Sequence, residues 1–370
     1  MHNTPTLQEA DRLMTVCNSC RYCEGLCAVF PAMELRTEFA RGDLNYLANL
    51  CHGCGACFDD CQFSPPHEFR VNVPQTFARL RAESYADYVW PSALAGVFAR
   101  NGLAISAITA LSIAAFIIGF IAYHDRAALF ATHAGPGAFY ALMPHNTMVA
   151  LFGAAFLFGL VALAMGLARF WRDIGEPTRT LGDARIMGEA LHDAATLRYL
   201  DGGGAGCRDE DEAGADRRRL YHHFTSYGFL LCFAATSVAT VYHYALGRIA
   251  PYAWHDLPVV LGILGGIGLV IGPAGLLLAK FKRTRTAQAT DYWGMDIAFI
   301  AMLFLTSLSG LALLALRHTP AMGLLLALHL GIVFSLFITM PYGKFVHPLY
   351  RLAALVRYAR ERRNPPASGE

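Results

Sequence analysis

Charged residues are scarce in this chain: they make up 16% of its 370 residues, while hydrophobic residues make up 55%. A soluble protein usually carries about 25% charged residues. The shortage argues against an ordinary soluble protein and favours a membrane protein. A strong net charge is also missing, since the formal net charge is +2. No stretch of Lys and Arg is interleaved with aromatic residues, so no nucleic-acid partner is predicted.

A secretory signal is also missing, because residues 1–15 are polar and contain no apolar core. Eight of the ten cysteines nevertheless fall within residues 17–61. In a cytoplasmic segment thiols stay reduced and are free to bind metal, whereas a secreted disulfide scaffold would follow a signal. The sequence therefore predicts a cysteine-rich head in the cytoplasm.

Long uncharged runs, by contrast, are abundant after a polar head of residues 1–90. Each run has about 20 residues or more, enough to cross ~30 Å of hydrocarbon as a helix. Burying six such helices in a soluble protein would need an implausibly large core. A mainly α fold with a six-helix transmembrane bundle is predicted, with helices near Gly102–Tyr123, Met148–Ala168, Phe224–Leu246, Leu257–Ala279, Ile297–Leu316 and Ala321–Met340.

The distribution of Lys and Arg predicts the orientation. These residues are frequent in the long loop 172–220, in the turn after the fourth run and in the tail 348–370, whereas the opposite loops carry Arg126, Arg248 and Arg317. By the positive-inside rule both termini are expected in the cytoplasm. The chain then divides into a head (1–90), helices one and two (91–171), the loop (172–220), helices three to six (221–347) and the tail (348–370).

Two cysteine motifs of the form C-x2-C-x2-C-x3-C occupy residues 17–27 and 51–61. In two-cluster ferredoxins three cysteines of such a run bind one cluster and the fourth binds the other. A zinc site needs four ligands, and eight cysteines in two complete runs exceed that need. A proline commonly follows the fourth cysteine of such a run, but Ala28 and Gln62 stand there in this chain. This difference weakens the prediction that the fourth cysteines are exchanged between clusters, and it leaves the prediction of clusters unaffected. A ferredoxin-like head with two [4Fe–4S] clusters is predicted, one held by Cys17, Cys20, Cys23 and Cys61 and the other by Cys51, Cys54, Cys57 and Cys27. Cys207 and Cys232 stand alone and are not expected to be ligands.

Histidines in and beside the apolar runs are candidate haem ligands. A bis-histidine haem takes one imidazole from each side of the ring, from different helices at matching depth. His329 lies in the sixth run and His347 lies beyond it; they are 18 residues apart, which places them on one face of a continuous helix, except that Pro341 is expected to kink the helix between them. Because the third helix runs outward and the sixth runs inward, His222 or His223 should meet His347 on the cytoplasmic side, and His243 should meet His329 near the outer side. One or two b-type haems are therefore predicted, although a histidine at an interface can also simply face water.

From about Leu220 to Arg363 the chain resembles the gamma subunit of respiratory nitrate reductases, a dihaem cytochrome b. The resemblance is carried by Leu220-Tyr-His222, by Trp293-Gly-Met-Asp296 and by His329 through Pro341 to His347. In that family a second ligand lies ten residues after the first, where this chain has Cys232. The resemblance thus implies either that His243 takes over or that one haem is bound.

The whole chain resembles the tricarballylate (citrate) utilization protein B family. Shared features are the two cysteine motifs, the stretch beginning Tyr199-Leu-Asp, and His222-His223 followed by Cys232 and His243. The resemblance implies a multi-pass protein of the bacterial inner membrane that reoxidises the flavin of an FAD-dependent tricarballylate dehydrogenase. Electrons would pass through the clusters and haem to the quinone pool, and no catalytic residue is expected here. Alternatives are another flavoprotein partner, as in cobalamin synthesis, and a redox sensor or membrane anchor.

Overall fold

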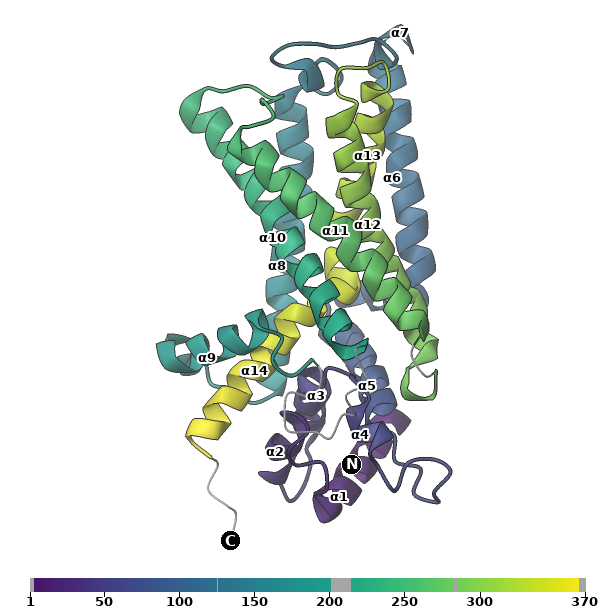
Figure 1. Cartoon of the computed structure of the whole chain (residues 1–370), viewed down its shortest axis with the longest axis vertical. Coiled ribbons are helices and arrows are strands. Elements are labelled where there is room, and N and C mark those ends of the chain that lie inside the picture. Colours follow the sequence, from purple (N-terminus) through teal and green to yellow (C-terminus); the bar gives the residue numbers. More distant parts are fainter. Residues whose placement is uncertain (1–2, 125, 201–213, 283–284, 366–370) are drawn as a thin grey trace.

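The computed structural model describes residues 3–124, 126–200, 214–282 and 285–365. Within these residues the regular structure is entirely helical, which confirms the predicted fold class. Figure 1 shows long helices gathered at one end of the molecule and a group of shorter helices at the other. The first helix and the last helix both lie in the group of shorter helices.

Six helices are long and apolar enough to cross a membrane, and each overlaps one of the predicted runs. They contain α6 (Asn101–Tyr123), α8 (His145–Asp173), α10 (Gly214–Leu246), α11 (Leu257–Lys282), α12 (Trp293–Ala315) and α13 (Met322–Thr339). A short helix η1 (Ser92–Arg100) leads into α6. The short elements α7 (Arg126–Leu129) and η2 (Ala138–Ala141) lie between α6 and α8. By the length and composition of these helices the chain is a membrane protein.

The head is formed by α1 (Pro5–Cys20), α2 (Val29–Glu34), α3 (Arg41–Leu50), α4 (Ala56–Asp59) and α5 (Val73–Tyr88). Local sequence determines where its two longest helices begin. The Thr4 hydroxyl accepts a hydrogen bond from the Leu7 N–H at 3.2 Å, and Pro5 follows as a favourable first helical residue. The Asn72 side chain accepts one from the Gln75 N–H at 3.2 Å and begins α5 in the same way.

The sixth helix ends close to the predicted end of its run, and it does not continue to His347. α13 stops at Thr339, two short 3-10 turns follow (η6, Met340–Tyr342, and η7, Lys344–Val346), and a separate helix α14 begins at His347 (His347–Arg363). Pro341 has no N–H for a helical hydrogen bond, and Gly343 adopts an extended backbone. The expectation that His329 and His347 lie on one continuous helix is therefore wrong. The segment expected to be a tail is largely α14, which packs among the helices of the head (Figure 1).

The long loop contains η3 (Thr178–Gly182) and α9 (Ala184–Ala195). Asp183 begins α9 by accepting a hydrogen bond from the Arg185 N–H at 2.9 Å. The glycine-rich stretch and Cys207 lie outside the described residues. Two further short helices, η4 (Arg285–Ala287) and η5 (Thr290–Tyr292), connect α11 to α12.

Helices α10 and α11 approach each other closely because their contact is lined by glycine. A Cβ atom added at Gly265 would lie 2.8 Å from the backbone nitrogen of Cys232 and 2.8 Å from its Sγ atom. Only a residue without a side chain allows backbones to come so near. Cys232 is thus a packing residue of this helix pair.

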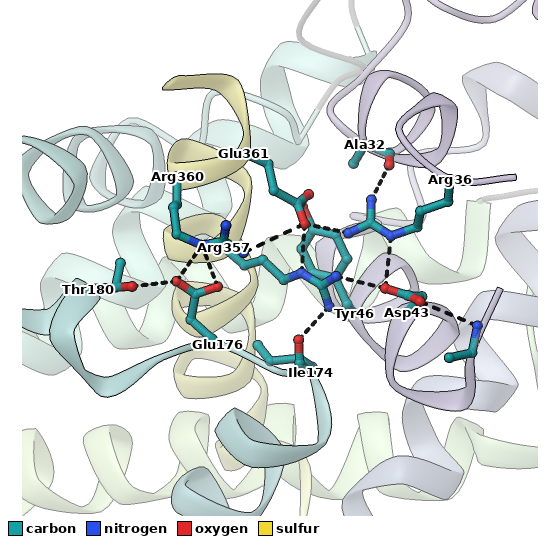
Figure 2. Close-up of polar contacts among 11 residues, drawn as sticks. Ala32, Arg36, Asp43, Tyr46, Ile174, Glu176, Thr180, Arg357, Arg360 and Glu361 are labelled. Carbon is teal, nitrogen blue, oxygen red and sulfur yellow. Dashed lines mark hydrogen bonds and ion pairs between the residues drawn. The ribbon is translucent and has the colours of Figure 1, made fainter. Parts of the chain in front are cut away.

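An ion network ties α14 to the head (Figure 2). Arg357 contacts the carboxylates of Asp43 at 2.7 Å and Glu361 at 2.8 Å, and Arg36 contacts the same two carboxylates. Glu361 is 2% exposed and also accepts a hydrogen bond from the Tyr46 hydroxyl at 3.1 Å. Because each buried charge has partners of opposite sign, the network holds α14 in one position against α2 and α3.

Candidate functional site

The first predicted group of cysteines lines one cavity of the head: Cys17, Cys20, Cys23 and Cys61. The chain reverses where α1 ends, at Arg21, which has a left-handed backbone (φ 55°) and donates its N–H to the Cys17 carbonyl oxygen at 2.7 Å. This reversal places Cys23 opposite the last turn of α1. Cys61 arrives from the other motif, just after α4.

The second group lines a separate cavity: Cys51, Cys54, Cys57 and Cys27. Cys51 follows α3, and the backbone then turns through Gly53 (φ 57°), a conformation that favours glycine. The Gly53 N–H donates to the Cys51 Sγ atom at 3.3 Å. Such N–H to sulfur bonds are common around iron–sulfur clusters, whose sulfurs they stabilise. The structure thus brings the eight cysteines together in the two predicted groups, and the fourth cysteine of each motif lies in the group of the other motif.

The spacing within these groups suits a cluster better than a single ion. Among the described residues, no set of three or more Cys, His, Asp or Glu side chains is close enough to hold one metal ion. A zinc ion would draw four sulfurs to about 2.3 Å from one point. Burial, then the neighbouring Cys23 and Cys61, raise the pKa of Cys17 to about 12. Four thiolates would therefore repel one another strongly here unless the positive charge of iron lay between them.

The two cysteine cavities are neighbours. Phe30, a fully buried residue of α2, lines both of them. They differ in exposure, because Cys20 of the first group is exposed whereas Cys51 of the second is buried. The first group therefore lies nearer the protein surface and the second lies deeper.

A third, larger cavity of about 490 Å³ lies between the head and the membrane helices. Its volume is in the range of cofactor pockets. His222 from α10 and His347, the first residue of α14, both line it. His52, Gly53 and Pro74 line this cavity and the second cysteine cavity alike. The three cavities thus form a series in which each shares residues with the next.

His347 is prepared to act as a ligand. Its Nδ1 atom lies 2.6 Å from the Lys344 carbonyl oxygen, which can only accept, so Nδ1 carries the proton and Nε2 keeps a free lone pair. Burial, followed by the nearby charges of Lys344 and Arg351, lowers the pKa of His347 to about 3. The imidazole is therefore neutral at physiological pH, as metal ligation requires.

The large cavity carries an excess of positive charge. The cations along its wall are Arg81, Arg218, Lys280 and Lys344, and Asp296 supplies a carboxylate. Asp296 lies 2.6 Å from Lys280 and also contacts Lys344. The rest of the wall is largely apolar, with residues such as Phe229, Leu276, Met295 and Phe299. The imidazoles of His222 and His347, an apolar wall and surplus cations suit a flat apolar group that carries two carboxylates, as haem does.

Comparisons with known proteins identify the family of this chain. The family model described as "Citrate utilization protein B" matches residues 97–368, and the model described as "Citrate utilization protein B Fer4-like domain" matches residues 10–87. The chain belongs to the citrate utilization protein B family. The curated Citrate utilization protein B of Escherichia coli is 48% identical over 362 residues, covering 98% of this chain and 94% of its own length. No solved structure matches.

Membership of this family confirms the resemblance of the whole chain, and its Fer4-like domain covers both cysteine motifs. This chain therefore joins a Fer4-like domain to six helices that are long and apolar enough to cross a membrane. The resemblance of residues 220–363 to the nitrate reductase gamma subunit stays a prediction.

The remaining histidines have other surroundings. His223 stacks on Tyr227, with ring centroids 5.7 Å apart, and does not line the large cavity, so of these two histidines only His222 shares that cavity with His347. The Nδ1 atom of His329 lies 3.0 Å from the Ser309 Oγ atom on α12. His243 stacks on His145, with ring centroids 3.9 Å apart. The structure therefore gives His243 and His329 different neighbours, and their pairing around a second haem stays a prediction.

Several residues of the site were missed by sequence reasoning. His52 and Tyr199 line the second cysteine cavity, and Arg81 and Asp296 line the large one. Tyr199 and Asp296 each belong to a stretch that carried a family resemblance, which was a usable signal. Arg81 lies on an ordinary amphipathic helix, and no local pattern distinguishes it from the other arginines of the head.

Proposed function

We propose that this protein is an electron-transfer component of the bacterial inner membrane, with both termini in the cytoplasm. It accepts electrons from the reduced flavin of an FAD-dependent tricarballylate dehydrogenase and delivers them to the quinone pool. The observation that carries this proposal is the series of three neighbouring cavities, two lined by four cysteines each and one lined by His222 and His347. When bound, two [4Fe–4S] clusters and a b-type haem would supply redox centres that each take one electron.

The chain's own residues have clear tasks in this proposal. The first cysteine group, with Cys20 exposed, faces the direction from which a soluble partner can approach. Phe30 separates the two cysteine groups and keeps water out between them. His222 and His347 would hold the haem iron, and Arg81 and Arg218 would face its carboxylates. No group in these cavities needs to bind or activate tricarballylate, so the carbon chemistry belongs to the partner.

The substrate rests on family membership. The Escherichia coli relative is named for citrate utilization, and tricarballylate is a close tricarboxylate analogue of citrate. A partner that dehydrogenates a tricarboxylate would need a route for two electrons out of its flavin. A membrane protein that takes them singly and passes them to lipid-soluble quinone would supply that route.

Purified full-length protein, prepared without oxygen, tests the haem and cluster assignments together. We expect iron in excess of haem iron, and a reduced-minus-oxidised spectrum with the bands of a b-type haem. His222→Ala and His347→Ala should each lower haem content strongly, while His223→Ala, one residue away and outside the cavity, should retain it. Equal haem content in all four proteins would refute the ligand assignment. A preparation without iron, after supply of iron, sulfide and haem, would refute the function.

A further inference from the structure

Three arginines from three different helices converge on the backbone that carries Cys51. Arg351 of α14 donates to the carbonyl oxygens of Asn49 at 3.2 Å and Cys51 at 2.6 Å. Arg81 of α5 donates to the Ala48 carbonyl oxygen at 3.0 Å and also to that of Cys51. Arg218 of α10 donates to the His52 carbonyl oxygen at 3.2 Å and lies 3.5 Å from that of Gly53.

Two of these guanidinium groups have only neutral partners. In the described part of the chain, neither Arg81 nor Arg351 forms an ion pair with a carboxylate, and their recorded acceptors are carbonyl oxygens. Placing positive charges together, partly buried and away from carboxylates, is unfavourable unless an anion lies close by. Arg351 does not line the large cavity and binds the Cys51 carbonyl oxygen, so for this arginine the cavity lined by Cys51 and its three partner cysteines is the adjacent place where such an anion would sit.

The surroundings of the first cysteine group are different. Arg12, the cation nearest Cys17, is already paired with Glu9 at 2.6 Å, and both side chains are about two-fifths exposed, at 42% and 41%. Arg21 is exposed and donates to the Asn18 carbonyl oxygen. Water and salt screen such charges efficiently, so they act weakly on a nearby group.

We propose that Arg81, Arg218 and Arg351 raise the reduction potential of the second cysteine site above that of the first. The inference rests on the proposed function and deepens it, because it makes the site beside the large cavity the preferred place for an electron. Reduction by one electron from the partner's flavin adds one negative charge to the site and makes or breaks no covalent bond. Nearby positive charge therefore favours the reduced state, as it does at other iron–sulfur sites.

An opposing effect must be outweighed. Cys51 is buried and Cys20 is exposed, and burial alone disfavours added negative charge. The arginines act at hydrogen-bond distance from the loop itself, where the intervening medium screens little. The effect of three positive charges on one added electron should exceed the effect of burial. The second site then has the higher reduction potential, which directs electrons from the surface toward the membrane.

Potentials measured on the purified full-length protein test this inference. Cys20→Ser and Cys54→Ser first assign the two cluster signals in electron paramagnetic resonance spectra. In a redox titration of the unaltered protein, the signal lost in Cys54→Ser should have the higher potential. Arg351→Gln should lower that potential and leave the other unchanged, and Arg351→Lys should restore most of the difference. Arg351 is the cleanest variant, because it does not line the large cavity. Arg12→Gln is the control, and it should shift either potential less than Arg351→Gln shifts the potential of the second site.

The outcomes separate this inference from the proposed function. If both clusters assemble and Arg351→Gln and Arg81→Gln leave the two potentials where they were, the inference is wrong and the function stands. The same holds if the first cluster has the higher potential in the unaltered protein. If no cluster assembles in the unaltered protein, the proposed function itself fails. Should Arg351→Gln not fold, Arg81→Gln and Arg218→Gln each remove one of the three charges and provide the same comparison.

Discussion

The Nη2 atom of Arg351 donates a hydrogen bond to the carbonyl oxygen of Cys51 at 2.6 Å, although the two residues are 300 positions apart in the chain. Arg351 lies about one helical turn after His347, so a single helix lines the large cavity and holds the second cysteine motif. The ion network around Glu361 fixes the far end of the same helix (Figure 2). Helix α14 therefore sets the spacing between the cysteine sites and the histidine-lined cavity.

The crossed grouping of the cysteines predicts which substitutions affect the same cluster. Cys61→Ser should remove the same paramagnetic signal as Cys20→Ser, although the two residues belong to different motifs. Cys27→Ser should likewise act as Cys54→Ser does. Each variant should lose about half of the cluster iron, because the other site keeps all four ligands. Cys232→Ser is the control and should retain both signals. If Cys61→Ser instead matched Cys54→Ser, each motif would bind its own cluster.

Loss of the carboxylate at Glu361 should destabilise the head. Glu361→Gln would leave Arg36 and Arg357 facing a neutral side chain in a buried place, where breaking an ion pair costs about 3–5 kcal/mol. Denaturant unfolding followed by tyrosine fluorescence measures the change. Glu189→Gln is the matched control, because its partners Arg362 and Arg363 are partly exposed and such pairs contribute less than about 1 kcal/mol. Equal effects of the two variants would contradict the central role of the network.

The same network predicts an acid dependence through Asp43. Burial raises the pKa of this carboxyl, but hydrogen bonds and charge from Arg36 and Arg357 outweigh it, and the net pKa is lowered. An unfolded Asp titrates near pH 3.9. The stabilisation by Asp43 is therefore fully present above that pH and is lost as the pH falls through the lower folded value. The stability difference between the unaltered protein and Asp43→Asn should be constant from about pH 7 to 5 and shrink below about pH 4. Asp87→Asn, at an exposed pair with Arg41, should change little at any pH.

Sequence patterns predicted those features that depend on local chemistry. The six membrane helices follow from the length of the uncharged runs. The two cysteine groups follow from the spacing of the cysteines within the two motifs, which is typical of a pair of clusters that share ligands. Pro341 indicated a kink but not a full break after Thr339, since proline also occurs within kinked helices; the two 3-10 turns and the extended Gly343 that follow could not be read from it. His222 and His223 could not be separated, because neighbours on a helix differ by about 100° in direction and the partner surface was unknown.

Contacts between distant segments were beyond the reach of these patterns. Arg351 and Asn49 are 302 positions apart, and Arg36 and Glu361 are 325 apart. Arg351 lies on a helix that looks ordinary by itself, and Arg36 lies in the turn that follows α2. Their roles depend on how α14 packs against α2 and α3, which no local signal encodes.

The contact between α10 and α11 predicts opposite effects for two similar substitutions. In an exposed helix, replacing Gly by Ala stabilises by about 1 kcal/mol. At Gly265 the added methyl group would lie 2.8 Å from the backbone of Cys232, so the helices must separate, and overpacking of this kind costs about 1–3 kcal/mol. At Gly262 the nearest atom is the Ala235 Cβ at 3.8 Å, an ordinary contact.

Since α10 carries His222 and α11 supplies Pro273 and Leu276 to the large cavity, separation of these two helices would also widen that cavity. We expect Gly265→Ala to melt at lower temperature and to release haem more readily, measured by the loss of haem absorbance on heating. Gly262→Ala should melt at the same temperature or higher and keep its haem, whereas the same loss in both variants would show that the close approach of α10 and α11 does not shape the cavity.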